Sequence, residues 1–295
     1  MKTSIATVSI SGTLAMLIPP SIAMVIYGLI AGVNISRLLM AGIIPGLIVM
    51  FTIMATCYFL VKLDPRRAPL SEPVSLIEKL RVLKLILPVL LLFSAVTGVI
   101  YTGIATPTEA SATGALFAAI LYFMRRGWKA GTAEMGELVG RAARTSCMVA
   151  FIIVGAKLFS TFFALTQSTQ ALIGWIGGLD MAPWVIILAL VAMYLALGCF
   201  MDQMAILVLT VPIVAPLVHS LGYDLVWFGV IMIVVAELGM VTPPVGLNCF
   251  VVSKYSNTPV SEVFRGTLPY VVTQGIAIAI LLLFPQLTLW LPNQM

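Results

Sequence analysis

Residues 14–20 read Leu-Ala-Met-Leu-Ile-Pro-Pro, and residues 238–244 read Leu-Gly-Met-Val-Thr-Pro-Pro. The match continues at Gly42 and Pro45, which reappear as Gly266 and Pro269 at the same offset of 224 residues. Two adjacent prolines cannot continue an α-helix, because each lacks an N–H donor and clashes with the preceding turn. Matching helix breaks in the two halves of a membrane protein indicate the binding site of a transporter.

The composition is that of a membrane protein. Hydrophobic residues make up 61% of the 295 residues and charged residues 9%, whereas a soluble domain carries about 25% charged residues. A transmembrane helix needs about 20 apolar residues, so the chain has room for about eight or nine membrane segments. The predicted fold is therefore an all-α integral membrane protein.

Charge and side-chain chemistry argue against several function classes. The formal net charge is +5, but the basic residues gather in a few loops, as the positive-inside rule describes, so nucleic-acid binding is not predicted. A single histidine, His219, leaves little room for His-based metal or triad chemistry. No HExxH motif or pair of intramembrane aspartates is present, so an enzyme is not predicted. Four cysteines without CxxC spacing are expected to be free thiols: Cys57, Cys147, Cys199 and Cys249.

The apolar stretches predict a membrane topology. In chain order, the predicted segments are a broken segment at 5–31, a span at 38–61, a basic linker at 63–84, a span at 85–103, a short helix at 107–124, a basic loop at 125–144, a span at 145–165, an interfacial helix at 170–179, a hairpin at 184–219, a second broken segment at 225–253 and a last span at 268–291. Both broken segments are interrupted at their Pro-Pro pair.

The hairpin is predicted from two short apolar arms, 184–197 and 205–218. They are joined by Gly198-Cys-Phe-Met-Asp202-Gln203. Each arm has only 14 residues, which is too short to cross a bilayer comfortably. A re-entrant hairpin that enters and leaves on one side is therefore expected, rather than two full spans.

The basic residues predict an orientation. With 63–84 and 125–144 in the cytoplasm, fourteen of the sixteen Lys and Arg residues lie inside. Arg37 then lies outside, and Lys157 lies within a span. The two Pro-Pro segments cross in opposite directions, so the repeat is inverted, as in alternating-access secondary transporters.

The repeat also predicts a division of the chain. Residues 1–62 are the remainder of a first inverted repeat, 63–84 form a cytoplasmic linker, and 85–295 form the second repeat. Partners for the spans and hairpin of the second repeat would lie up to about 140 residues before Met1. The first repeat is therefore expected to be incomplete.

Polar and glycine residues beside the two breaks are the first candidates for a binding site. A helix broken at membrane depth releases carbonyls and amides that lipid cannot satisfy. Carbonyls are hard oxygen donors that suit Na⁺, and helix N-termini favour anions. The candidates are Gly12, Thr13 and Ser21 around Pro19-Pro20, and Thr242, Gly246 and Asn248 around Pro243-Pro244. The alternative is a structural kink whose hydroxyl groups bond within their own helix.

Several charged residues occur in apolar surroundings. Asp202 at the hairpin turn and Glu237 before Pro243 are candidates because an intramembrane carboxylate is costly. The alternative for Asp202 is to cap the second arm. Lys157 would pair with one of these carboxylates, attract an anion or extend toward the interface. Thr106-Pro107-Thr108-Glu109 is typical of a capped helix start.

Four ordered motifs resemble the large membrane subunit of TRAP transporters, the tripartite ATP-independent periplasmic transporters. These motifs are Gly12-Thr-Leu-Ala-Met-Leu-Ile-Pro-Pro-Ser21, Gly103-Ile-Ala-Thr-Pro-Thr-Glu-Ala110, Gly198-Cys-Phe-Met-Asp202 and Gly239-Met-Val-Thr-Pro-Pro-Val-Gly-Leu-Asn248. The closing Phe284-Pro-Gln-Leu-Thr-Leu-Trp-Leu-Pro292 is also typical of that family. The resemblance covers the whole chain, although the family's large subunit has a longer N-terminal part that carries a first hairpin.

The resemblance implies a function, partners and a site. It implies an elevator-type, Na⁺-driven importer of organic anions such as C4-dicarboxylates or sialic acid, located in the bacterial inner membrane as a multi-pass protein. It implies a small four-helix membrane subunit and a periplasmic substrate-binding protein as partners. The implied substrate and ion site comprises Gly12, Thr13, Pro19, Pro20, Ser21, Gly198, Asp202, Thr242, Pro243, Pro244, Gly246 and Asn248. Carbonyls and hydroxyls near Gly12, Thr13, Gly198, Thr242 and Gly246 are expected to bind Na⁺.

Two other readings remain open. One is a carboxylate/Na⁺ secondary transporter that works without a binding protein. The other is a membrane subunit or fragment that does not itself transport, which would not need inverted broken helices.

Overall fold

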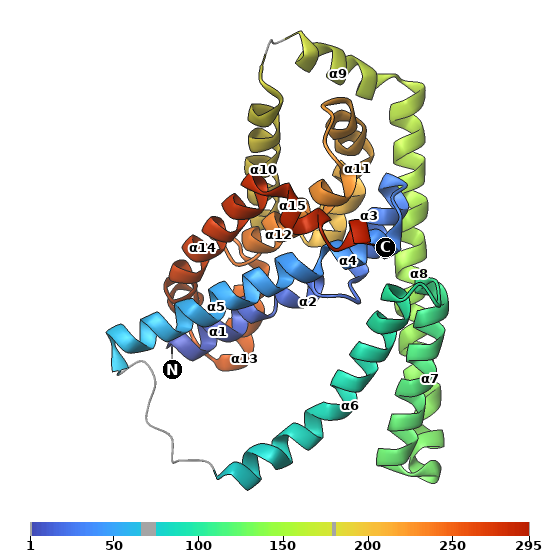
Figure 1. Ribbon diagram of the computed structural model, residues 1–295, viewed down its shortest axis with the longest axis vertical. Coiled ribbons are helices and arrows are strands. Elements are labelled where there is room, and N and C mark those ends of the chain that lie inside the picture. Colours follow the sequence, from blue (N-terminus) through green and yellow to red (C-terminus); the bar gives the residue numbers. More distant parts are fainter. Residues whose placement is uncertain (1, 66–74, 179–180, 295) are drawn as a thin grey trace. The chain divides into compact units, whose positions relative to one another are not determined.

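The computed structural model describes residues 2–65, 75–178 and 181–294, and every regular element within these ranges is a helix (Figure 1). The expectation of an all-α chain is confirmed for them. Contacts divide the chain into two compact units, Met1–Pro69 with Gly155–Gln294, and Leu70–Val154. Both Pro-Pro pairs and the hairpin belong to the first unit.

The first broken segment forms three helices, as its prolines predict. They are α1 (Lys2–Ser11), α2 (Leu14–Leu17) and α3 (Ile22–Ala31). The helix axis bends by 42° between the part that ends at Leu17 and α3. Helix α3 begins at Ser21, whose Oγ accepts a hydrogen bond from the Met24 N–H at 3.3 Å, a normal N-cap arrangement.

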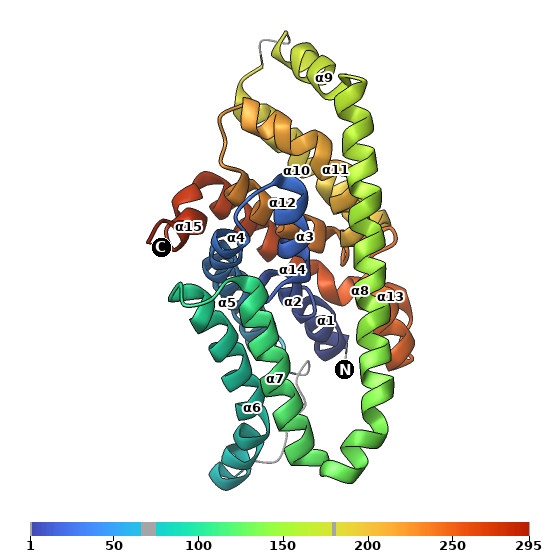
Figure 2. The ribbon, with the colours of Figure 1, turned by 90° about the vertical axis from the view of Figure 1, so that its right-hand side faces the viewer.

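The hairpin consists of α10 (Pro183–Phe200) and α11 (Gln203–Ser220), which run in opposite directions (Figures 1 and 2). The predicted arm length is wrong, because each arm has 18 residues. Gly198, Cys199 and Phe200 continue α10, and Asp202 caps α11 directly. By length and composition, each arm is therefore a candidate membrane span.

The second broken segment follows the hairpin. It comprises α12 (Leu225–Gly239) and α13 (Leu247–Ser256), with Pro243-Pro244 between them. Asp224 starts α12, because its Oδ1 accepts hydrogen bonds from the Val226 and Trp227 N–H groups at 2.6 and 3.3 Å. The Pro-Pro peptide bond is cis in both broken segments.

The remaining helices of the first unit connect and flank these segments. They are α4 (Ile35–Ala41), α5 (Ile43–Leu63), the end of α8 (Trp128–Leu165), α9 (Ser168–Gly177), α14 (Val260–Leu283), α15 (Pro285–Leu289) and the 3₁₀-helix η2 (Pro292–Gln294). Helix α9 lies within two residues of the short helix predicted at 170–179. Within the described ranges, five helices are long and apolar enough to cross a membrane, or six if the first broken segment counts as one.

Helix α12 is the core of the first unit. All of its residues from Val226 to Gly239 are buried, and it contacts α10, α11, α14, α4 and α3. The Tyr27 hydroxyl of α3 donates to the Leu225 carbonyl at 2.8 Å, and the Trp227 indole N–H donates to the Leu281 carbonyl at 3.1 Å. These bonds satisfy the polar ends of two large aromatic side chains, as buried Tyr and Trp residues require.

The second unit contains α6 (Leu76–Tyr101), α7 (Pro107–Arg126) and the first part of α8. Helices α6 and α7 pack against each other in opposite directions (Figure 2). The predicted capped start at Thr106 is confirmed: its side chain and that of Glu109 form a capping box, with Pro107 in the first turn.

Two predicted loop regions are helical instead. The basic linker at 63–84 is predicted as a loop, but α6 already begins at Leu76 behind a Ser75–Glu78 capping box. The basic loop at 125–144 is mostly helix, because α8 starts at Trp128. The Glu137–Arg141 ion pair, four residues apart, supports that helix. Arg66 and Arg67 lie outside the described residues.

Candidate functional site

The first break leaves two backbone carbonyls without their helical donors. The donors would come from Pro19 and Pro20, which have no N–H. The Met16 carbonyl, which would pair with Pro20, instead accepts a hydrogen bond from the Ser21 hydroxyl. The Thr13 hydroxyl donates to the Ile10 carbonyl at 2.7 Å. Thr13 and Ser21 are both buried, so polar oxygen atoms gather inside the protein at this break.

At the second break, the carbonyls that lose their helical donors find main-chain donors instead. Pro243 and Pro244 deprive the Gly239 and Met240 carbonyls of their helical donors. The Gly239 carbonyl accepts from the Thr242 N–H at 2.9 Å, and the Met240 carbonyl accepts from the Asn248 N–H at 3.1 Å. Met240 corresponds to Met16 at the 224-residue offset. The carbonyl at the equivalent position of each break, that of Met16 or Met240, therefore regains a hydrogen bond. The donor is a side-chain hydroxyl in the first break and a main-chain N–H in the second.

Thr242 and Gly246 shape the segment between α12 and α13. The Thr242 hydroxyl donates to the Leu238 carbonyl at 2.6 Å. Gly246 has a φ of +56°, and a Cβ atom there would lie 2.6 Å from Cε1 of Phe264. Both the left-handed conformation and the lack of space require glycine at this position.

The hairpin tip and the second break are packed backbone to backbone. A Cβ atom on Gly198 would lie 2.9 Å from the Gly239 Cα, and still closer to the Ala236 carbonyl oxygen. A Cβ atom on Gly239 would lie 2.6 Å from the Gly198 Cα. The Gly246 N–H also donates to the Cys199 carbonyl at 3.2 Å. The structure thus brings the predicted residues Gly198 and Gly246 into one cluster with Gly239.

Asp202 lies at the hairpin tip, where its carboxylate caps α11. Its Oδ1 accepts hydrogen bonds from the Met204 and Ala205 N–H groups at 2.8 and 3.1 Å. The side chain is exposed. The capping alternative is therefore present, and the exposed carboxylate remains accessible to a ligand.

Two buried polar side chains near these segments lack hydrogen-bond partners within the described chain. Gln203 is 2% exposed and neither of its amide atoms has a partner, and Glu237 is 3% exposed with Oε1 unpartnered. Glu237 corresponds to Thr13 at the repeat offset, so a buried polar residue precedes both breaks. Gln203 was not among the predicted residues, and its only sequence signal is its place beside Asp202.

Contacts between α1 and α13 bring the surroundings of the two breaks together. The Ser9 Oγ lies 3.5 Å from the Cys249 Sγ, and these residues lie just before the first break and just after the second. The Cys249 thiol also lies 3.5 Å from the Val241 carbonyl. Helix α2 contacts α12 as well. Residues from both copies of the repeat therefore lie together in one region of the first unit.

Lys157 and His219 lie apart from this region. Lys157 is exposed on α8, and within the described ranges no ion pair joins it to Asp202 or Glu237. His219 is also exposed, near the end of α11. Neither is placed among the polar groups of the two breaks.

The oxygen atoms at the breaks suit a hard cation. The hydroxyls of Thr13, Ser21 and Thr242 all use their hydrogen atoms within their own segment. Each hydroxyl oxygen has two lone pairs, so acceptor capacity remains for a cation. In the described residues, no group of three or more His, Cys, Asp or Glu side chains is placed to hold a metal ion.

Comparison with known proteins identifies relatives along almost the whole chain. The "C4-dicarboxylate TRAP transporter large permease protein DctM" of Pseudomonas aeruginosa is 34% identical over 96% of this chain and 66% of its own length. The "Sialic acid TRAP transporter large permease protein SiaM" of Vibrio cholerae is 33% identical over 94% of this chain and 64% of its own length. The "Ectoine TRAP transporter large permease protein TeaC" of Halomonas elongata is 32% identical over 98% of this chain and 67% of its own length.

These relatives are named as transporter permeases, not as enzymes, and the chain spans about two thirds of their length. The family model described as "Tripartite ATP-independent periplasmic transporter, DctM component" matches residues 1–287. The chain belongs to this DctM family of TRAP transporter permeases, and it is a multi-pass protein of the bacterial inner membrane.

Proposed function

We propose that this chain contributes the second hairpin and both broken helices to a Na⁺-coupled importer of organic anions that receives its substrate from a binding protein. The proposal rests on one observation: the tip of the hairpin is held against the second break by the Gly198–Gly239 contact. Where a hairpin tip packs on a broken helix, side chains and freed backbone groups come close together, as in the binding sites of transporters with discontinuous helices.

The helix bounds support an inverted repeat. Shifted by 224 residues, α3 would cover 246–255, and α13 spans Leu247–Ser256. Shifted likewise, α4 and α5 together would cover 259–287, and α14 spans Val260–Leu283. The distribution of basic residues predicts that the two copies cross the membrane in opposite directions. Such a pair is the usual framework for alternating access.

The same contact supports an elevator-type movement. Helices α10 and α12 touch directly through the backbones of Gly198 and Gly239. Because protein interiors are close-packed, one helix cannot move past the other at such a contact without a clash. The hairpin and the second break are therefore expected to move as one body. Bound Na⁺ and substrate would travel with this body, rather than being passed between separately moving helices.

We assign Na⁺ binding to oxygens around Gly12 and Thr13 at the first break, and around Gly198, Thr242 and Gly246 at the second. The hydroxyl oxygens there retain lone pairs, and carbonyl oxygen is the donor type that Na⁺ prefers in such sites. The N-terminal end of α11, with Gln203 and the exposed Asp202, completes the polar lining.

The substrate is proposed to be a small organic molecule with a carboxylate group. The names of the three relatives described above include C4-dicarboxylates, sialic acid and ectoine, which share a carboxylate, whereas a further relative, 33% identical, is named for the sulfonate isethionate. The proposed partners are a small four-helix membrane subunit and a periplasmic substrate-binding protein, as the words "tripartite" and "large permease" in the names of the family and the relatives suggest.

The ion proposal can be tested on the 295-residue chain itself. Thermal unfolding of the purified chain is expected to shift upward in NaCl relative to KCl at equal ionic strength, because a ligand that binds the folded state stabilises it. The Thr242→Val variant should lose most of this shift. Thr161→Val is the matched control, because the Thr161 hydroxyl also donates to a carbonyl one turn earlier, at 2.9 Å, but on α8. Equal unfolding temperatures in both salts would overturn the ion assignment.

The coupling proposal needs a transport experiment. Vesicles with this chain, its small subunit and its binding protein should accumulate a labelled carboxylate only with an inward Na⁺ gradient. Uptake that continues without the binding protein would favour the alternative carboxylate/Na⁺ transporter. Uptake that needs ATP but no Na⁺ would contradict the proposed mechanism. No uptake, together with a retained Na⁺ effect on stability, would favour a non-transporting subunit.

A further inference from the structure

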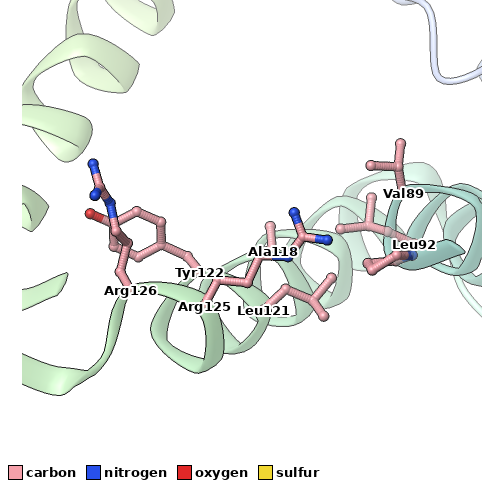
Figure 3. Close-up of a pocket in the computed structure, with 8 residues that line it drawn as sticks. Val89, Leu92, Ala118, Leu121, Tyr122, Arg125 and Arg126 are labelled. Carbon is pink, nitrogen blue, oxygen red and sulfur yellow. The ribbon is translucent and has the colours of Figure 1, made fainter. Parts of the chain in front are cut away.

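Glu237 is a buried ionisable residue of α12 to which the proposed function gives no role. No other side chain of α12 is ionisable. The Glu237 side chain is 3% exposed, and its Oε1 has no hydrogen-bond partner within the described residues. Its surroundings restrict what it can bind. By contrast, the groove of about 510 Å³ between α6 and α7 (Figure 3) has mostly apolar walls, and its Arg126 is paired with Glu134, so it defines no ligand.

The position of Glu237 on α12 directs its side chain away from the hairpin. Ala236 and Gly239 meet Gly198 of α10. Because an α-helix has about 3.6 residues per turn, Glu237 is turned by about 100° from Ala236 and by about 160° from Gly239. The carboxyl group therefore lies on the side of α12 that faces away from α10. It is separate from the oxygens around Gly198 that are assigned to Na⁺.

The helices that pack against α12 bring no charged partner to Glu237 among the described residues. These helices are α2, α3, α4, α10, α11, α14 and α15. Their ionisable side chains are Tyr27, Arg37, Tyr194, Cys199, His219, Glu262, Arg265 and Tyr270. Within the described ranges, none of these side chains forms a hydrogen bond or an ion pair with Glu237. Arg37 donates to Asn293 at 2.9 Å, and His219 and Arg265 are exposed.

We propose that Glu237 is a proton-binding site of this permease. A carboxylate that is enclosed by protein without a cation or a donor is costly, and such a group takes up a proton instead. A metal ion would need several oxygen ligands at once, whereas a proton needs only the carboxyl group. The carboxylate takes one proton from water before α12 is enclosed, and it returns this proton when water reaches the carboxyl group again.

The proton has a consequence for movement. In the proposed elevator movement, α12 would travel without an uncompensated charge, although the site itself does not depend on Na⁺ coupling. The equivalent residue of the first copy is Thr13, whose hydroxyl does not ionise in the physiological range. The site is therefore present at one of the two breaks.

The pH dependence of unfolding gives one measurement. Above a pH of about 5, Glu237 is ionised in the unfolded chain, whereas the proposal keeps it protonated in the folded chain. The folded chain then binds one proton more than the unfolded chain. As the pH rises, the ratio of folded to unfolded chain should therefore fall by up to about tenfold per pH unit relative to Glu237→Gln. Glu237→Met serves the same comparison if Glu237→Gln does not fold. Parallel pH dependence of the unmodified chain and the variant would overturn the proposal.

Infrared spectroscopy of the purified full chain observes the proton directly, because a protonated carboxyl group and a carboxylate absorb at different frequencies. At neutral pH in KCl, the unmodified chain should show a protonated-carboxyl band that Glu237→Gln lacks. Glu109→Gln is the matched control, because it removes an exposed carboxylate and keeps a residue type that a capping box accepts. The band should persist in this control. Equal spectra of the unmodified chain and Glu237→Gln in this region would contradict the proposal.

Replacing KCl with NaCl distinguishes a proton from Na⁺ at this site. A band that persists in NaCl supports the proton site. Loss of the band in NaCl would make Glu237 a ligand of Na⁺ and would overturn the proposal. This spectroscopic result is independent of the unfolding shift that tests Na⁺ binding at Thr242, so either proposal can fail without the other.

Discussion

Gly198 and Gly239 lie back to back, so that a side chain on either one would strike the backbone of the other helix. This contact joins α10 of the hairpin to α12 of the second broken segment, the two helices that contact each other most extensively in the first unit. Gly198 lies four residues before Asp202, and Gly239 lies three residues before Thr242, two residues of the predicted site. The contact therefore fixes how the hairpin tip faces the break.

Alanine at either glycine is expected to force the two helices apart. Gly198→Ala and Gly239→Ala should each lower the free energy of unfolding by about 1–3 kcal/mol, the usual cost of overpacking. Thermal or denaturant unfolding of the purified chain measures this change. In Gly275→Ala the added methyl meets nothing within 4 Å in α14, so stability there should stay equal or rise by up to about 1 kcal/mol. Similar losses in all three variants would argue against the contact.

Gly246 combines two requirements that substitutions can separate. Its positive φ alone costs a residue with a side chain about 1–2 kcal/mol, and the contact with Phe264 adds to this cost. Gly32 has a φ of +69° with nothing within 4 Å of an added Cβ atom, so Gly32→Ala measures the first cost alone. Gly246→Ala is expected to destabilise the chain more than Gly32→Ala, and adding Phe264→Leu should recover part of the difference. If Gly246→Ala and Gly32→Ala lower the free energy of unfolding equally, Phe264 does not restrict position 246.

Asp202 has a capping role that serine can replace. Asp202→Ala should cost about 0.5–2 kcal/mol, and Asp202→Ser should restore most of it. If the exposed carboxylate also contacts a substrate or an ion, the Asp202→Ser variant will be stable but will not support uptake into vesicles. Asp224 caps α12 in the same way, so Asp224→Ser is the matched control and should transport normally. Full uptake by Asp202→Ser would limit Asp202 to capping.

Glu237 is expected to be kept for function rather than for stability. Replacing a buried group that lacks a partner with an apolar one of similar shape is nearly neutral or stabilising. Glu237→Met should therefore unfold at the same temperature as the unchanged chain or higher, while Na⁺-driven uptake falls by at least tenfold. Gln274, also buried with an unpartnered amide nitrogen on α14, provides the control Gln274→Met. A drop in stability above about 2 kcal/mol for Glu237→Met would reveal a structural partner.

The broken helices could be predicted because proline acts locally. Single prolines lie inside helices of this chain, such as Pro88 in α6 and Pro269 in α14. Two adjacent prolines remove two consecutive N–H donors, and the observed helices end within a few residues of both pairs. The capped start at Thr106 was readable for the same reason. Ser75-Leu-Ile-Glu78 carries an equivalent capping signal, but its place in a basic stretch favours a loop in the sequence.

The closest contacts of the site could not be predicted from the sequence. A glycine pattern does not say which distant backbone approaches it, so the pairing of Gly198 with Gly239 required the three-dimensional structure. The burial of Gln203 likewise depends on how α11 packs, although its neighbour Asp202 is exposed. The charged residues at 125–144 favour a loop in the sequence, but the i, i+4 pairing of Glu137 with Arg141 favours the helix that α8 forms there.

Helix α12 is hydrophobic, yet from Val226 to Gly239 it is buried by other parts of the chain. Its 15 residues extend about 22 Å at about 1.5 Å per residue, less than the roughly 30 Å of a hydrocarbon core. Because only protein surrounds it, this helix has no need to match the thickness of the bilayer, and it can stop partway. If the proposed Na⁺ binds at Pro243-Pro244, the burial of α12 beside the break means that protein oxygens, rather than bulk water, would replace the hydration shell of the ion.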